Sequence, residues 1–168
     1  MHKEGGAHPN EQKGSTDTKP IVEASVPKMM IYPMSMHIGA PAEPIVEVGD
    51  QVKVGQMIAK EGGFVSAHVY SSVSGIVTAI ESRLQAGGSE VESIIIKNDY
   101  MYTKAHPIIT PGHSSEMSNK EIIDTIRKAG IVGMGGATFP AAIKLAPPEE
   151  KKLDTVILNG AECEPYST

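Results

Sequence analysis

The segment that decides the fold of the first half of the chain is VGDQVKVGQMIA, residues 48–59. The pairs Gly49-Asp50 and Gly55-Gln56 are typical of tight turns, because glycine tolerates backbone conformations that other residues avoid. Apolar and polar residues alternate after the first turn, as in strands with one buried face. The segment therefore predicts short strands joined by tight turns. The residues expected to point inward are Val52, Val54 and Ile58.

A second segment of the same kind is SSVSGIVTAI, residues 71–80, which is typical of a turn that leads into a strand. Short apolar runs without helical periodicity, several of them rich in β-branched residues, lie between turn residues across this part of the chain. These runs are residues 29–32, 45–48, 51–54, 57–59, 75–80 and 94–97. Residues 82–90 are predicted to form a flexible hairpin loop. We therefore expect an all-β domain over residues 29–98.

The order of the two segments resembles the biotinyl/lipoyl-like barrel–sandwich fold, in which a G-D-x-V-x-x-G-Q half precedes an S-x-x-x-G-x-V-x-x-I half. Carrier members of that fold present a modified lysine at the tip of the hairpin between the halves. Here that hairpin is KEGGFVSA, residues 60–67, with Phe64 and Val65 at the tip and Lys60 too early. The pattern favours a scaffold over a lipoyl or biotin carrier. A mass adduct after treatment with the ligases would favour the carrier instead.

The rest of the sequence predicts an arm, a linker and the start of a second domain. Residues 1–28 are polar and rich in turn residues, which predicts an irregular arm. Residues 99–117 contain the proline, glycine and serine that are typical of an interdomain linker. Apolar residues at helical spacing then predict a helix over residues 118–129, with a capping box formed by Ser118 and Glu121.

Further signals follow this helix. Gly130 predicts its end, and Pro140 predicts the start of a short helix through residues 141–144. Residues 153–159 are predicted to form a buried strand of the parallel type. We therefore expect residues 118–168 to be the first part of an α/β domain. The predicted fold class of the whole chain is mixed α+β.

Composition narrows the range of functions. The chain has 168 residues, with 15 Lys and Arg against 20 Asp and Glu, and a net charge of −5. Nucleic-acid binding depends on concentrated positive charge, so the composition disfavours a nucleic-acid partner. No apolar run approaches the ~20 residues of a membrane-spanning helix. The single cysteine, Cys163, cannot by itself close an internal disulfide or hold an iron–sulfur cluster.

Two segments carry residues suited to ligand binding, and the first is GIVGMGGATFP, residues 130–140. In a glycine-rich loop that leads into a helix, unpaired backbone amides can hold a phosphate. Lys144, one turn into the predicted helix, can add a positive charge. The loop matches neither the Walker A pattern nor the Rossmann pattern, and a tight turn without a ligand is the alternative.

The second segment is NGAECEP, residues 159–165, directly after the predicted strand. Ligands of α/β folds bind at the carboxyl ends of parallel strands. The amide of Asn159 and the carboxylates of Glu162 and Glu164 are suited to hydrogen bonds with sugar hydroxyls or with the edge of a flavin ring. The alternative is a solvated loop.

In this order, the motifs G-x-G-G-A-x-F-P and N-x-x-E-x-E-P resemble the flavin- and NADH-binding subunit of respiratory complex I. Three further motifs are similar to the RnfC family, the C subunits of the Rnf ion-translocating electron-transport complex. They are GGAHP at residues 5–9, HIGAPA at residues 37–42 and GGFVSA at residues 62–67. The resemblance covers essentially the whole chain. GGAHP also favours this family over the cobalamin-reducing flavoprotein of propanediol degradation, which shares the glycine-rich stretch.

The resemblance implies an electron-transfer function. Members of the family take hydride from NADH onto FMN and pass electrons through two 4Fe–4S clusters in a ferredoxin-coupled complex. It implies a peripheral location on the cytoplasmic face of the bacterial membrane, with the other subunits and NADH as partners. The residues it places along the FMN phosphate and ribityl chain are Gly133, Gly135, Gly136 and Lys144. It places Phe139 near the nicotinamide or adenine ring, Asn159 and Glu162 at the flavin, and Glu164 at the NADH ribose.

The sequence departs from the family pattern at two positions of the loop. Thr138 stands where glycine is usual, so a Cβ is expected to crowd the ligand or tilt the loop. Met134 replaces the arginine of the complex I relatives. The family is also much longer and carries two cysteine-rich motifs, whereas this chain has no C-x-x-C motif. We therefore expect an N-terminal piece that binds FMN weakly or not at all in a fluorescence titration. A non-catalytic scaffold that docks onto other subunits is the alternative.

Overall fold

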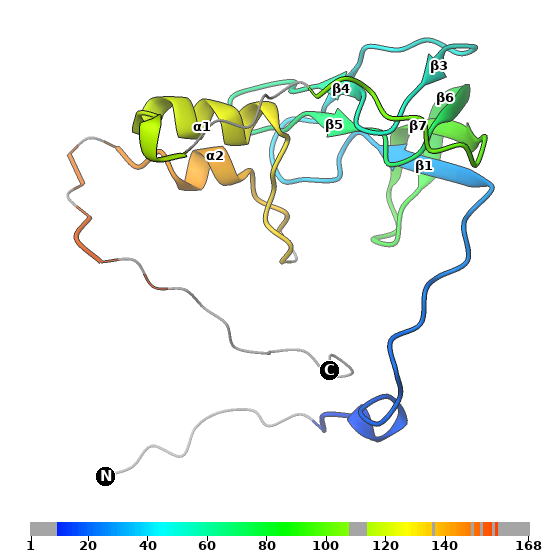
Figure 1. The fold of residues 1–168 in the computed structure, drawn as a ribbon, viewed down its shortest axis with the longest axis horizontal. Coiled ribbons are helices and arrows are strands. Elements are labelled where there is room, and N and C mark those ends of the chain that lie inside the picture. Colours follow the sequence, from blue (N-terminus) through cyan, green and yellow to red (C-terminus); the bar gives the residue numbers. More distant parts are fainter. Residues whose placement is uncertain are drawn as a thin grey trace. The chain divides into compact units, whose positions relative to one another are not determined.

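The computed structural model describes residues 10–107, 114–135, 137–148, 150–151, 153–155 and 157. The chain divides into two compact units, one of residues 27–150 and the other of residues 1–26 together with residues 151–168. The first unit contains the strands and α-helices of the described residues (Figure 1). The second contains, among its described residues, the short 3₁₀ turn η1 (Lys13–Ser15).

The strands form two antiparallel sheets. The four-stranded sheet has the order β1 (Met29–Pro33), β7 (Glu90–Asn98), β6 (Gly75–Leu84) and β3 (Gln51–Val52). The three-stranded sheet has the order β2 (Glu43–Pro44), β4 (Met57–Lys60) and β5 (Val69–Tyr70). Strand β6 pairs with β7 along its whole length, with an irregularity between Val77 and Ala79. This architecture confirms the predicted all-β barrel–sandwich domain.

The core of this domain combines apolar side chains from both sheets and from the connection after β1. The largest fully buried apolar side chains are Met34, Val52, Ile58, Val77, Ile94 and Ile96. Two of the three predicted inward residues are therefore confirmed, and Val54 is only half-buried. Alternation of apolar and polar residues identified the buried face because successive side chains of a strand point to opposite sides of a sheet.

Both predicted turns of the deciding segment are confirmed. Gly49 has φ 101° and Gly55 has φ 78°, in the left-handed region that favours glycine. In each turn a side chain closes the backbone: the Asp50 carboxylate accepts from the Glu47 amide at 2.8 Å, and the Gln56 side-chain oxygen accepts from the Lys53 amide at 3.0 Å. These local hydrogen bonds explain why the turns could be read from sequence.

Two predicted strand boundaries are wrong. The run at residues 45–48 forms no strand, and the pairing in this region is made instead by β2, just before it. The predicted hairpin loop at residues 82–90 is shorter, because β6 continues through Leu84 and β7 begins at Glu90. The ends of these strands are exposed, Leu84 included, and Arg83 is ion-paired to Glu81 at 2.6 Å. Backbone pairing of an antiparallel ribbon does not require a buried face, so the hydrophobic pattern missed this extension.

The two predicted helices are confirmed. Helix α1 (Asn119–Lys128) begins at Ser118, whose hydroxyl accepts from the Glu121 amide while the Glu121 carboxylate accepts from the Ser118 amide. It is followed by Gly130 at φ 65°. Helix α2 (Ala141–Lys144) follows Pro140 and packs against α1 (Figure 1). A short 3₁₀ turn, η2 (Ser114–Glu116), precedes α1.

The predicted strand at residues 153–159 is wrong over the residues that the structure describes. Residues 153–155 and 157 form no strand, and Leu153 and Ile157 are 68% and 87% exposed. A parallel strand requires paired neighbours and cover on both faces. The unit of residues 1–26 and 151–168 contains, among its described residues, no strand that could pair in this way. Residues 156, 158 and 159 lie outside the described part. Among the helices that the structure describes, none is long and apolar enough to cross a membrane.

Candidate functional site

The glycine-rich segment forms a closed loop between the two helices. Val132 and Pro140 form an antiparallel bridge at its base. Inside this bridge, the Gly133 amide donates to the Phe139 carbonyl at 2.8 Å. Met134 lies fully exposed at the tip of the loop. The segment is therefore a defined hairpin-like loop that holds its own shape.

Three of the predicted site residues come together in this loop. The Lys144 ammonium lies against Gly133, where an added Cβ would stand 2.8 Å from the Lys144 nitrogen. The same ammonium is 5.9 Å from the centre of the Phe139 ring, within reach of a cation–π attraction. Gly135 has open space where a Cβ would be. The other predicted residues, Gly136, Asn159, Glu162 and Glu164, lie outside the described residues.

The expectation that bare amides at the helix start hold an anion is wrong for three of them. The Ala141 amide donates to the Ile131 carbonyl at 2.9 Å. The Ile143 and Lys144 amides donate to the Pro140 carbonyl at 3.2 and 3.4 Å. Helix α2 also has only four residues, so it adds little dipole. Positive charge at this loop therefore comes from Lys144.

Lys144 is well suited to an anion. Within the described part of the chain, no carboxylate lies at ion-pair distance from its ammonium. The side chain is exposed, and Gly135 has open space where a side chain would stand. A lysine beside backbone of this kind is a typical phosphate-binding arrangement. The residues present therefore fit the phosphate of a nucleotide cofactor.

Thr138 has a role that the sequence did not predict. Its φ is 43°, and its hydroxyl donates to the Met36 carbonyl at 2.7 Å. Beside it, the Ile38 amide donates to the Ala137 carbonyl at 3.3 Å. The Thr138 side chain is thus directed to the segment after β1. No sequence signal identifies this contact, because the acceptor is a main-chain carbonyl far away in the chain.

The end of helix α1 also rests on the β domain. Arg127 forms an ion pair with Glu61 at 2.8 Å, with each side chain 29% exposed. The Tyr70 hydroxyl donates to the Lys128 carbonyl, and burial raises the pKa of Tyr70. Gly130 packs so closely that an added Cβ would stand 2.6 Å from the His68 carbonyl oxygen. A pocket of about 410 Å³ lies at this junction, lined mainly by β1, β5 and residues 129–132.

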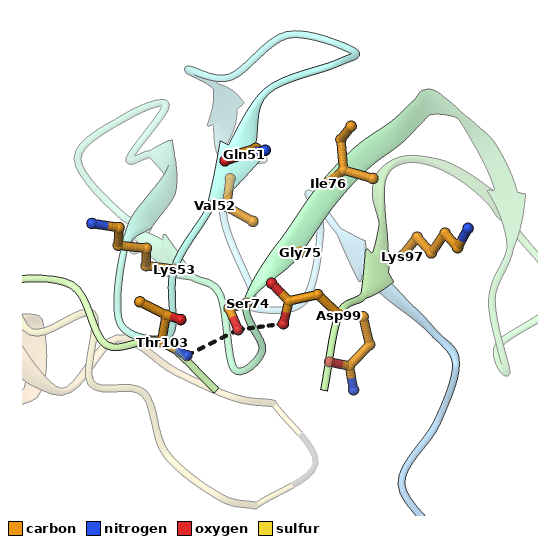
Figure 2. A pocket seen from close by; sticks show the side chains of 10 residues that line it. Gln51, Val52, Lys53, Ser74, Gly75, Ile76, Lys97, Asp99 and Thr103 are labelled. Carbon is orange, nitrogen blue, oxygen red and sulfur yellow. Dashed lines mark hydrogen bonds between the residues drawn. The ribbon is translucent and has the colours of Figure 1, made fainter. Parts of the chain in front are cut away.

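A second pocket, of about 370 Å³, lies between β3, β6 and the residues after β7 (Figure 2). The buried Ser74 hydroxyl donates to the Asp99 carboxylate at 2.6 Å and accepts from the Thr103 amide at 3.0 Å. Hydrogen bonds from Ser74 and from the Met101 amide lower the pKa of Asp99. The same lining includes Lys53 and Lys97, so the pocket carries charges of both signs. These residues were not among the predicted site residues, although an Asn-Asp pair at the end of a strand is a turn signal.

Comparison with known proteins assigns the chain to a family. A family model described as the RnfC barrel sandwich hybrid domain matches residues 1–101, more than half of the chain. The chain belongs to the RnfC family. A second model, described as the Nuo51 FMN-binding domain, matches residues 126–168 of this RnfC chain. That match begins at the end of α1 and includes the whole glycine-rich loop.

Curated RnfC relatives are similar over nearly the whole chain. It is 49% identical to the C subunit of the proton-translocating ferredoxin:NAD(+) oxidoreductase complex of Clostridium ljungdahlii, over 98% of this chain and 36% of the relative. It is 50% identical to the C subunit of the Na(+)-translocating ferredoxin:NAD(+) oxidoreductase complex of Acetobacterium woodii, over 98% of this chain and 37% of the relative. It is 42% identical to the C subunit of the ion-translocating oxidoreductase complex of Rhodobacter capsulatus, over 98% and 32%. The chain therefore spans about a third of the length of these RnfC relatives.

The structure also bears on the carrier alternative. Lys60 lies within β4, where its ammonium is ion-paired with Glu43 at 3.0 Å. Phe64 stands in the following connection and is 79% exposed. The connection that follows β4 in this RnfC chain therefore exposes an aromatic side chain.

Proposed function

We propose that this chain is part of the C subunit of an ion-translocating ferredoxin:NAD⁺ oxidoreductase, and that its glycine-rich loop holds the phosphate of FMN. Three observations support the proposal. The relatives carry that activity in their names. The FMN-binding family model covers the loop. The observation that carries it is the Lys144 ammonium, which lies against Gly133 without a carboxylate partner among the described residues.

The residues of the chain have separate tasks in this proposal. Lys144 neutralises the phosphate, and glycines 133, 135 and 136 let it approach the backbone. Phe139 lies beside Lys144 and offers an aromatic face to the nicotinamide or adenine ring of NADH. Asn159 and Glu162 orient the flavin, and Glu164 binds the ribose of NADH. When bound there, FMN would supply the chemistry that links hydride transfer from NADH to single-electron transfer.

The remaining parts of the proposal concern the whole subunit. One cysteine cannot hold the two expected 4Fe–4S clusters, so we assign them to the part of the subunit outside this chain. The partners are the other subunits of the complex and NADH, with ferredoxin as the coupled redox protein. The location is the cytoplasmic face of the membrane. We propose residues 1–28 as an arm, 29–98 as the barrel–sandwich domain, 99–117 as a linker and 118–168 as the first part of the FMN domain.

The test is the FMN affinity of the complete subunit with Lys144→Ala. A charge-assisted hydrogen bond to a phosphate contributes enough that its loss weakens binding by about ten-fold or more. The matched control is Lys120→Ala, which removes an exposed lysine from the first turn of α1. FMN fluorescence is expected to report an unchanged dissociation constant for the control. Equal FMN affinity of Lys144→Ala and the unsubstituted protein would refute the proposal.

A second candidate function is a docking scaffold for other subunits. It is favoured by Phe64, which is highly exposed on a connection held tightly to the barrel. The Ser66 hydroxyl donates to the Ala40 carbonyl at 2.9 Å and accepts from the Gly62 amide at 3.0 Å, which fixes this connection. If Phe64 docks a partner, Phe64→Ser lowers recovery of the assembled complex without changing FMN affinity. The measurement is the yield of the assembled complex, purified with phenylalanine or with serine at position 64.

A further inference from the structure

The segment between β1 and β2 holds the glycine-rich loop at its far side. The Thr138 hydroxyl donates to the Met36 carbonyl at 2.7 Å, and the Ile38 amide donates to the Ala137 carbonyl at 3.3 Å. The two hydrogen bonds run in opposite directions between neighbouring positions. They connect residues 137 and 138 of the loop to the barrel–sandwich domain.

The backbone of Thr138 needs this connection. Its φ of 43° lies in the left-handed region, which a β-branched residue rarely adopts. Such a conformation persists when surrounding contacts hold it. Here the side chain donates to Met36, and the Thr138 amide donates to the Gly135 carbonyl at 2.9 Å. The residue is therefore held from both its side chain and its backbone.

The platform beneath the loop is itself fixed. His37 is buried, and its Nε2 lies 3.2 Å from both the amide nitrogen and the carbonyl oxygen of Ala67. The Ala40 amide donates to the Val65 carbonyl at 2.9 Å. Gly39 packs against the same Val65 carbonyl, so closely that a Cβ there would collide with it. Segment 36–40 is thus anchored in the barrel, although it forms no strand.

The other end of the loop is anchored to the same domain. Arg127 is ion-paired with Glu61, and Tyr70 donates to the carbonyl of Lys128. Gly130, where the loop begins, packs on the His68 carbonyl. Both ends of the phosphate-binding loop therefore rest on the barrel–sandwich domain. The domain has the position of a fixed platform, which differs from the swinging arm of carrier domains.

We propose that Thr138 is a positioning residue, through which the barrel–sandwich domain sets the shape of the FMN-binding loop. The inference rests on the proposed function, because the loop must bind FMN for its shape to affect affinity. The anchoring itself exists without FMN. Loss of one neutral hydrogen bond is expected to increase amide exchange of residues 133–139 and the FMN dissociation constant, each by about five-fold.

The test compares three substitutions at Thr138 in the complete subunit. Thr138→Val removes the hydroxyl and keeps the shape, whereas Thr138→Ser keeps the hydroxyl. Thr138→Ala removes the hydroxyl without adding bulk and keeps a Cβ, which makes it informative if the valine variant folds poorly. Thr18→Val is the control, because it removes an exposed threonine hydroxyl from a segment outside the loop. Hydrogen–deuterium exchange is measured without FMN, and FMN affinity is measured separately.

We expect faster loop exchange and weaker FMN binding in the valine and alanine variants, and unchanged values for Thr138→Ser and Thr18→Val. Unchanged exchange and affinity in Thr138→Ala would overturn the inference. If serine does not rescue, the hydroxyl is not the cause, and the inference also fails. The Lys144→Ala variant separates the two claims. If Lys144→Ala weakens FMN binding while the Thr138 variants change neither exchange nor affinity, only the positioning role is refuted.

Discussion

Glycines at close approaches show how single residues determine this structure. Gly75 begins β6 so near to β7 that an added Cβ would collide with the Lys97 carbonyl oxygen. Gly133 leaves the space that the Lys144 ammonium occupies. The first glycine serves strand pairing and the second serves the candidate site, although the sequence marks them in the same way.

At this scale we predict that Gly75→Ala destabilises the protein. The collision is with backbone, which cannot move aside without disturbing the β6–β7 pairing, so a loss of about 1–3 kcal/mol is expected. Urea unfolding followed by circular dichroism measures it. Gly87→Ala is the matched control in the hairpin loop, because an added Cβ there meets no atom within 4 Å. Equal unfolding midpoints for the two variants would contradict the account.

At the scale of elements, features that depend on residues close in sequence were predicted correctly. Features that depend on pairing with distant residues were not. The capping box of α1 and the turns at Gly49 and Gly55 were predicted because their hydrogen bonds join residues close in sequence. The extension of β6 and β7 was missed because backbone pairing leaves no hydrophobic signature. A strand at residues 153–159 needs neighbouring strands to pair with, and the hydrophobic pattern does not show whether such strands are present.

The capping box also gives helix α1 a predicted pH dependence. Hydrogen bonds from Ser118 lower the pKa of Glu121 from its ordinary value of 4.5. The stabilisation is therefore present above the pKa of the unfolded chain and is lost as pH falls through the pKa of the folded protein. Carboxyl NMR titration is expected to show a higher pKa for Glu121 in Ser118→Ala. Ser118→Thr, which keeps a capping hydroxyl, is expected to retain the lowered pKa.

The outcome of that titration is decisive for the cap. If Ser118→Ala leaves the pKa of Glu121 unchanged, the hydrogen bonds described for the capping box do not hold the carboxylate in solution. The helix would then depend on its contacts with α2 and the β domain.

At the scale of the whole molecule, one apolar core holds the two sheets together. Ile94 is fully buried in the central strand β7, whereas Ile31 of the neighbouring strand β1 is 47% exposed. We predict that Ile94→Ala lowers the free energy of unfolding by about 2–5 kcal/mol, since it leaves a cavity between the sheets. Ile31→Ala is expected to cost much less. Urea unfolding of both variants provides the comparison, and equal losses would refute this description of the core.

The candidate site was only partly predictable from sequence. Lys144 and Gly133 were identified because a glycine-rich loop before a helix is a local pattern. The contact from Thr138 to Met36 spans 102 positions and ends on a carbonyl oxygen, so no pattern indicates it. The roles of the site residues stay predictions. The structure shows that Lys144 lies beside Gly133, and it was needed to show that the barrel–sandwich domain contacts the loop.

The most direct test of the central claim is hydrogen–deuterium exchange of the complete subunit with and without FMN. The account predicts slower exchange in peptides that cover residues 130–144, and no change in peptides that cover the pocket at residues 74–76 and 97–103. Protection at that pocket without protection at residues 130–144 would contradict the account.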